Sequence, residues 1–285
     1  MSFRVATLQT SDNVTIQYQI GQKCAEGSPA IFFCHGVGAN HDQFAAQQSF
    51  ADDYCVVTPT LRGHGNSGSP SDITADSLTL QRFALDILEL AQHLSIDELH
   101  FVGHGFGGLI GLEILRQQPA ALLSLSLCGV SPCQCSFTLP QWLRNFTYNL
   151  MGFSHQERIV SQMITQHETT QRVYYEMLKM TDRQTLRHIL KSISQYDYLD
   201  VLKKNRKIPV LVMRSEGDDR INDALDPCLE KLKGQRNIDI MRVNSTGHMI
   251  NMETPEYFNQ ILHAFLLKAK LKDSKPLSVP PELQP

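Results

Sequence analysis

The segment FVGHGFGG, from Phe101 to Gly108, decides between two possible folds for this chain. It continues an apolar run typical of a buried strand and leads into a segment with helical spacing, so we predict a sharp turn between a strand and a helix. Gly103, Gly105 and Gly108 match G-x-G-x-x-G, the phosphate-binding turn of dinucleotide-binding proteins. The same residues also fit the tight turn that presents a catalytic nucleophile, with glycine standing at the nucleophile position.

The dinucleotide interpretation fails at the next strand. Such a site needs an acidic residue about 20 residues further on, at the end of the following strand, to bind the ribose hydroxyls. The following predicted strand ends in SLCGVSP, residues 126–132, which contains no carboxylate. The match also lies a third of the way along the chain, after several predicted strands. We therefore favour the nucleophile turn.

Composition predicts a globular protein that acts on a small molecule. The chain has 285 residues, of which 42% are hydrophobic and 19% charged, which suits one large domain or a domain with an insertion. A net charge of -3 provides no basic surface for nucleic acid or an anionic membrane. The first residues, MSFRVATLQTSDN, lack the apolar core of a signal peptide, and no apolar run approaches the roughly 18 residues of a membrane span. We expect a cytoplasmic protein without a membrane or nucleic-acid partner; the sequence does not indicate an oligomeric state.

The cysteines are expected to be reduced thiols without a metal. There are seven of them, an odd number with irregular spacing. Cys133 and Cys135 lie close in sequence, but they lack the two-residue spacer and the second ligand pair of a zinc site. The sequence therefore predicts no metal site, and no cofactor either.

Strand-like and helical segments alternate along most of the chain. This alternation predicts an α/β fold, with a mostly parallel sheet of about eight strands covered by helices on both faces. Helical apolar spacing occurs at 78–94 and 109–116. The predicted strands are 3–10, 13–20, 30–34, 54–59, 99–103, 122–129, 209–215 and 238–244.

A helical segment interrupts this rhythm. Residues 131–205 have helical periodicity without a strand, and they hold several aromatic residues, including Trp142, the only tryptophan. We interpret this segment as a helical lid that contributes apolar walls to a pocket. The core then comprises residues 1–130 and 206–268, and the Pro-rich residues 269–285 are predicted to be a disordered tail.

Five motifs in order resemble those of the α/β-hydrolase superfamily, over about residues 3–268. FCHGVGANHDQF (33–44) is similar to the His-Gly loop after the third strand, and PTLRGHGNS (59–67) to the stretch after the fourth, with Thr60 in place of the usual aspartate. VGHGFGG (102–108) matches the family's V-G-H-S-x-G-G turn except at Gly105. RSEGDD (214–219) and NSTGHMINMETPEYFNQIL (244–262) are similar to the acid loop and the histidine loop with its closing helix.

The resemblance implies a set of site residues. His248 would be the general base, and Asp218 would orient it, with Asp219 as the alternative acid. The Phe106 N–H lies at a helix N-terminus, where it is a natural donor to an oxyanion, and the family analogy assigns the second donor to the Val37 N–H. Because both donors are backbone groups, neither depends on Gly105.

The remaining expectations concern the pocket. His35 and His104 are expected to make structural hydrogen bonds while bordering the substrate pocket. The residues predicted to line the pocket are His35, Gly36, His104, Trp142 and Met249.

Gly105 leaves the activity open, because it has no nucleophilic side chain and excludes an acyl-enzyme at this residue. A His–Asp dyad could activate water, or it could remove a proton from a substrate as in a cofactor-independent lyase. A non-catalytic ligand-binding protein of the same fold is the alternative. A second alternative is an esterase-like or thioesterase-like serine hydrolase whose serine was replaced by glycine.

Overall fold

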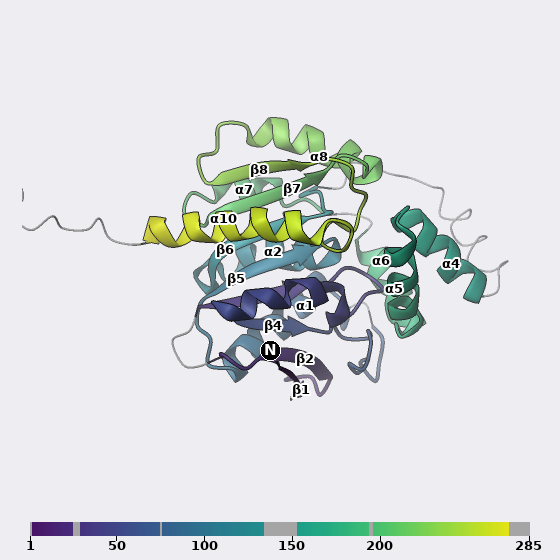
Figure 1. Ribbon diagram of the computed structural model, residues 1–285. Helices are drawn as coiled ribbons and strands as arrows, with labels where there is room; N and C mark the ends of the chain where they lie inside the picture. The colour runs from purple at the N-terminus through teal and green to yellow at the C-terminus, as the bar shows by residue number, and fades with distance from the viewer. Residues whose placement is uncertain (1, 25–28, 75, 134–152, 194–195, 274–285) are drawn as a thin grey trace, which may run out of the picture.

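An eight-stranded sheet forms the centre of the molecule, with strand order β1-β2-β4-β3-β5-β6-β7-β8 (Figure 1). The computed structural model describes residues 2–24, 29–74, 76–133, 153–193 and 196–273. β2 pairs antiparallel with both β1 and β4, and all other neighbours are parallel. The strands are β1 (Phe3–Gln9), β2 (Thr15–Gly21), β3 (Ala30–Cys34), β4 (Cys55–Pro59), β5 (Leu99–His104), β6 (Leu122–Cys128), β7 (Val210–Ser215) and β8 (Ile238–Val243). The expected α/β fold with a mostly parallel sheet is confirmed.

Helices cover both faces of this sheet. On β3, Phe32 belongs to an apolar cluster with residues of α1, α2, α7 and α8, whereas Phe33 belongs to a second cluster with residues of η1 and α10. α10 crosses the front of the sheet in Figure 1. Successive residues of a strand point to opposite faces of the sheet, and all residues of β3 are buried. Such a strand needs helices on both sides of the sheet. The helices of this double cover are the 3₁₀ helix η1 (His41–Asp52), α1 (Leu80–His93), α2 (Phe106–Gln117), α7 (Leu199–Lys204), α8 (Asp219–Leu232) and α10 (Pro255–Asp273), with the short η2 (Pro119–Ala121) and α9 (Ile250–Glu253).

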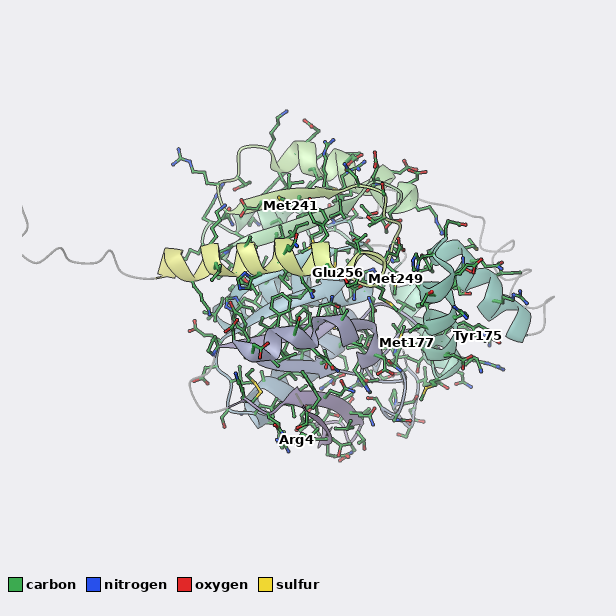
Figure 2. The ribbon with its side chains drawn as sticks, in the orientation of Figure 1. Arg4, Tyr175, Met177, Met241, Met249 and Glu256 are labelled. Carbon is green, nitrogen blue, oxygen red and sulfur yellow. A yellow bond between two sulfur atoms is a disulfide. The ribbon has the colours of Figure 1, made fainter. Side chains whose placement is uncertain are left out.

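Three further helices lie beyond the carboxyl ends of the strands, to the right in Figure 1. They are α4 (Phe153–Ile164), α5 (Glu168–Lys179) and α6 (Arg183–Ser192), all between β6 and β7. A small apolar cluster joins them to the core, in which Met177 and Leu178 of α5 pack with Ala39 and Met249 (Figure 2 labels Met177 and Met249). Helices α4 to α6 thus lie within the predicted lid, whereas α7 near its end covers the sheet, and the Trp142 segment and residues 274–285 lie outside the described residues. The predicted division into core and lid stays a prediction, but the predicted tail began too early, because α10 continues to Asp273 and buries Ala269.

The cysteines differ from the expectation of reduced thiols. Cys24 is bonded to Cys55, and Cys133 to Cys228, whereas Cys34 and Cys128 are free and buried. Residues separated by 31 and 95 positions in the chain are brought together by the fold. Spacing in the sequence therefore could not reveal these pairs. Within the described ranges, no helix combines the length and apolar character needed to span a bilayer.

The sheet order places two loops together at its centre. β3 lies between β4 and β5, so the chain leaves β3 toward one side and returns on the other. Ligands of such sheets bind at the carboxyl ends of the strands where the order reverses. At this edge Cys34, the last residue of β3, is the pairing partner of Gly103 in β5. The His-Gly loop and the glycine-rich turn follow directly from these two strand ends.

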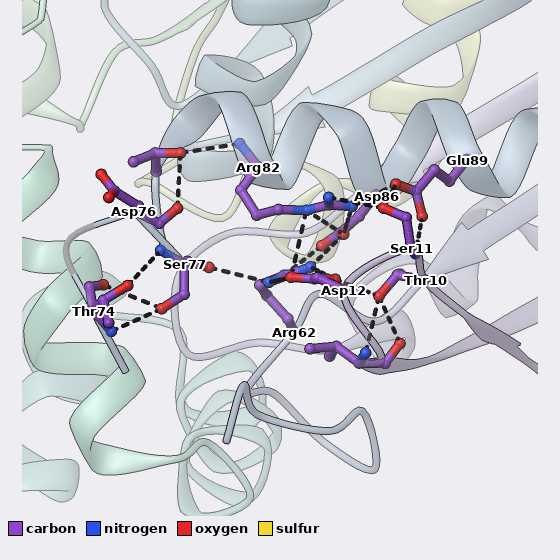
Figure 3. Close-up of polar contacts among 12 residues, drawn as sticks. Thr10, Ser11, Asp12, Arg62, Thr74, Asp76, Ser77, Arg82, Asp86 and Glu89 are labelled. Atoms are coloured by element: carbon purple, nitrogen blue, oxygen red, sulfur yellow. Dashed lines mark hydrogen bonds and ion pairs between the residues drawn. The ribbon is translucent and has the colours of Figure 1, made fainter. Parts of the chain in front are cut away.

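A buried guanidinium organises the loop after β4 (Figure 3). The Arg62 side chain is 0% exposed and donates to both Asp86 carboxylate oxygens, at 2.7 and 2.6 Å, and to both Asp12 oxygens, at 2.8 and 3.0 Å. It thereby joins the β1–β2 hairpin to α1. The next residue, Gly63, accepts a hydrogen bond from the Asp182 N–H at 2.7 Å, just before α6. The helices between β6 and β7 therefore rest on a loop that the Arg62 network holds in place.

We expect Arg62→Met to destabilise the protein by about 3–5 kcal/mol, because it leaves the buried Asp86 without its main counter-charge. Urea unfolding measures this loss. The control is Arg214→Met, whose partner Asp226 has a side chain that is 51% exposed, so its loss should cost about 0–1 kcal/mol. Equal losses in the two variants would contradict this account of the network.

The same network predicts a pH dependence. Burial by itself raises the pKa of Asp12, but hydrogen bonds from Arg62 and Thr10 and the charges of Arg62 and Arg82 lower it to about 2. A depressed carboxyl pKa contributes stability above its usual value of 3.8, and this contribution disappears as the pH falls toward 2. Acid titration of unfolding should show this component in the natural protein and not in Asp12→Asn.

Candidate active site

Glycines that no other residue could replace without movement flank the tip of the turn between β5 and α2. A Cβ on Gly103 would lie 2.4 Å from the Gly107 carbonyl oxygen, and one on Gly107 would lie 2.2 Å from the Cys34 oxygen. Gly105 itself occupies the tip, immediately before α2, with φ of +53°. This is the left-handed conformation that a nucleophile turn imposes on its central residue and that glycine adopts without strain.

A histidine–aspartate pair lies opposite this turn. The His248 Nδ1 is 2.7 Å from Asp218 Oδ2, and the His248 carbonyl accepts from His104 Nε2 at 2.8 Å. Asp218 is buried, whereas the adjacent Asp219 is exposed at the start of α8. Burial by itself raises the pKa of Asp218, but the hydrogen bond and charge of His248 hold that pKa below its usual value. The geometry therefore favours Asp218 over Asp219 as the partner of the imidazole.

The second ring nitrogen of His248 faces the glycine. A Cβ built on Gly105 would be 3.7 Å from His248 Nε2 and 3.8 Å from the Gly129 carbonyl oxygen, which are ordinary contact distances. Gly129 also makes room, because a Cβ there would lie 2.8 Å from His104 Nε2 and 3.0 Å from His248 Cε1. Next to Nε2 there is thus space for a small group that the turn itself does not supply.

The two proposed oxyanion donors lie in the same region. In the part of the chain that the structure describes, neither the Val37 nor the Phe106 N–H donates to a protein acceptor. Phe106 is the first residue of the 12-residue α2, so its N–H is at the positive end of the helix dipole. The Val37 loop is held on both sides, since the Gly36 N–H donates to Gln43 Oε1 at 3.0 Å and Tyr174 Oη donates to the Val37 carbonyl at 2.9 Å.

A cavity of about 310 Å³ opens at this point, between the sheet edge and α4 to α6. Seven of the predicted site residues line it: Gly36, Val37, His104, Gly105, Phe106, His248 and Met249. Asp218 reaches the cavity only through His248, and Trp142 lies outside the described residues. Most of the remaining lining is aliphatic or aromatic. Among the described residues, no group of three or more possible metal ligands occurs.

His35 corrects one expectation, because it does not line the cavity. Its ring is fully buried beneath the loop, where Nδ1 is 2.7 Å from the Gly36 carbonyl and Nε2 accepts from the Leu61 N–H at 2.9 Å. Burial lowers the pKa of His35 well below its usual value, and it lowers that of His104 to about 3. Both rings are therefore neutral at physiological pH and act as hydrogen-bonding supports, the structural role predicted for them.

Sequence reasoning missed the residues that hold the histidine loop. Glu253 accepts from the backbone N–H groups of Gly247 and Met249, on both sides of His248, and from Thr165 Oγ1 at 2.7 Å. It fixes the loop and connects it to the end of α4. METPEY contains two glutamates, and the sequence does not distinguish Glu253, because its role depends on how the histidine loop folds back on it and on Thr165, 88 residues away.

A model described as the alpha/beta hydrolase family matches residues 31–261 of this sequence. The chain belongs to this family. The expected class, a hydrolase of the α/β-hydrolase fold, is therefore confirmed at this level.

Individual relatives are more distant. The chain is 24% identical over 251 residues to 3-oxoadipate enol-lactonase 1 of Acinetobacter baylyi, covering 85% of this chain and 90% of that one. It is 26% identical over 264 residues to the dihydrolipoyllysine-residue acetyltransferase component of the acetoin cleaving system of Pseudomonas putida, covering 85% of this chain but only 65% of that protein. Its fold is similar to the crystal structure of the enol-lactonase from Burkholderia xenovorans LB400, with a TM-score of 0.78 and 18% identity over 92% of this chain and all of that one.

Restoring a side chain at the turn tests the geometry. Gly105→Ser should react covalently with a fluorophosphonate probe, because its Cβ would stand 3.7 Å from His248 Nε2 and its hydroxyl would reach the ring. The left-handed backbone should cost the variant about 1–3 kcal/mol of stability. Mass spectrometry of the labelled protein and urea unfolding measure the two effects.

Gly105→Ala is the matched control, since it carries the same backbone strain without a hydroxyl and should not be labelled. Labelling of Gly105→Ser should also disappear when His248→Ala is added. Labelling of the unmodified protein, at any residue, would mean that the nucleophile is elsewhere.

Proposed function

We propose that this protein hydrolyses a partly apolar ester, thioester or lactone by direct attack of water, without an acyl-enzyme. The observation that carries the proposal is the space at Gly105, which separates an oriented histidine from the turn that normally supplies a serine. A water molecule in this space would have His248 Nε2 and the Gly129 carbonyl as neighbours. Both are acceptors, so both protons of that water have a partner.

The reaction is a single displacement. The water transfers a proton to His248 Nε2 as its oxygen attacks the substrate carbonyl carbon, and Asp218 stabilises the imidazolium that forms. The tetrahedral intermediate then expels the alcohol or thiol, which takes the proton back from His248. The products are a carboxylic acid and the protonated leaving group.

Backbone donors stabilise the charge that develops. In this proposal, the carbonyl oxygen of the substrate lies near the Val37 and Phe106 N–H groups, which have no protein acceptor among the described residues. Donors held in place by the fold need no reorganisation when the oxyanion forms, which is why they stabilise it strongly. The Gln43 and Tyr174 hydrogen bonds keep one of the two donors in position.

The helices α4 to α6 act as the lid of this site in the same proposal. They contribute Val160, Ile164, Tyr174, Leu178 and Leu186 to the cavity, which gives the substrate an apolar environment and limits access of bulk water. The partner is a small molecule whose reacting carbonyl lies at the sheet edge and whose apolar part contacts these helices.

Substitution of the dyad tests the function. With a panel of aryl esters and lactones, His248→Ala should lower kcat/KM by about 10²–10⁴-fold, because it removes the general base. Asp218→Asn should also lower it, since the amide no longer favours the tautomer with a proton on Nδ1. Steady-state hydrolysis measures both effects, and His263→Ala, an exposed histidine on α10, is the control that should leave the rate unchanged.

Pre-steady-state kinetics distinguishes water attack from an acyl-enzyme. The natural protein should release the aryl leaving group without a burst, and prior treatment with fluorophosphonate should not inhibit it. A burst or complete inhibition would refute direct attack by water. Absence of turnover on the whole panel, together with a ligand affinity that is unchanged in His248→Ala, would instead identify a non-catalytic binding protein. Activity that survives in His248→Ala would refute the dyad.

A further inference from the structure

We infer that the substrate carries an anionic group, a carboxylate or a phosphate, at the end remote from the reacting carbonyl. The inference concerns Arg183 and Arg187 on α6, and it rests on the proposed function for the position of that carbonyl. Both arginines line the cavity, and no Asp or Glu does so among the described residues. They are the only side chains of permanent charge in the described lining. The described lining therefore carries arginine and no carboxylate, although the whole chain has a formal charge of -3.

The positions of the two arginines on α6 put both on one face of the helix. They are four residues apart, which is about one turn and about 6 Å of rise. Leu186 and Leu190 lie on the same face and also line the cavity. A helix wall with two leucines and two arginines combines an apolar surface with guanidinium groups, which suits an apolar ligand with one anionic end.

Exposure indicates where on the wall the charge lies. Arg183 and Arg187 are exposed although they line the cavity, so they lie at its opening to solvent. Leu186 and Leu190 are only partly exposed, and Gly105 and His248 are partly buried at the sheet edge. The reacting carbonyl and the anionic group of the ligand would thus contact different ends of one cavity, with apolar contacts between them.

Arginine is the residue best suited to this recognition. Its planar guanidinium donates two parallel hydrogen bonds to a carboxylate or phosphate and keeps its charge at any physiological pH. Within the described ranges Arg187 forms no ion pair. Its guanidinium is therefore available to a ligand at the cavity opening, and Arg183 adds a second positive charge one turn earlier.

Binding of non-hydrolysable ligands tests the inference independently of turnover. The probes are N-methylamides of alkanoic acids, with chains of about six to ten carbons to match the cavity, compared with the same amides carrying a terminal carboxylate or a terminal phosphate. We expect at least one anionic series to bind about tenfold more tightly than the neutral series, as a charge-assisted hydrogen bond at a partly solvated site would provide. Calorimetry measures the dissociation constants, and the preference should weaken as the ionic strength rises.

Variants on the helices assign the preference to its residues. Arg187→Gln should remove most of the preference for the anionic probe, Arg187→Lys should keep much of it, and Arg183→Gln should weaken it. Arg172→Gln is the matched control, because Arg172 is exposed on α5 and does not line the cavity. Circular dichroism verifies that each variant is folded.

Several outcomes would overturn the inference. Equal affinity for neutral and anionic probes would do so, as would a preference that survives in the Arg183→Gln, Arg187→Gln double variant, which would place the anion elsewhere. Failure of all probes to bind would also refute it. A preference that depends on the arginines, in a protein without esterase activity, would support the anion site while the hydrolytic function fails.

Discussion

Close approach of two backbones at the centre of the sheet is the constraint on which this site depends. The carbonyl of Cys34 at the end of β3 lies where a side chain of Gly107 would begin, so the turn after β5 and the loop after β3 are in direct contact. This contact brings the Val37 N–H and the first N–H groups of α2 to the same sheet edge. The site therefore begins as a backbone arrangement, and side chains are added to it from other loops.

A site built from backbone does not depend on a side chain at position 105. Glycine at position 105 relieves the strain of the left-handed turn and leaves the helix N-terminus, the Asp218–His248 pair and the loop supports in place. The position next to His248 Nε2 is then available to a small molecule rather than to a covalently attached hydroxyl. In the proposed function, Gly105 makes water the nucleophile, whereas the backbone donors and the Asp218–His248 pair keep their places.

The surroundings of the dyad restrict it to one arrangement. Glu253 anchors the backbone on both sides of His248, and the His104 ring, neutral because it is buried, donates to the His248 carbonyl. With Nδ1 bonded to Asp218, the remaining nitrogen points toward the cavity. Helices α4 to α6 then complete the cavity, and the buried Arg62 network supports the loop on which α6 rests.

The strands, the turn glycines and the order of the acid and histidine loops could all be predicted from the sequence, because local periodicity and backbone sterics act over short distances. All eight expected strands occur, and so do the paired Asp218 and His248. Tertiary structure alone decided which aspartate reaches the imidazole, that His35 lies beneath the cavity, that Glu253 anchors the histidine loop, and which cysteines pair. These outcomes depend on contacts between residues 26 to 95 positions apart, such as Asp218 with His248 and Glu253 with Thr165. Strand order and helix packing create such contacts, and the spacing of residues in the sequence does not reveal them.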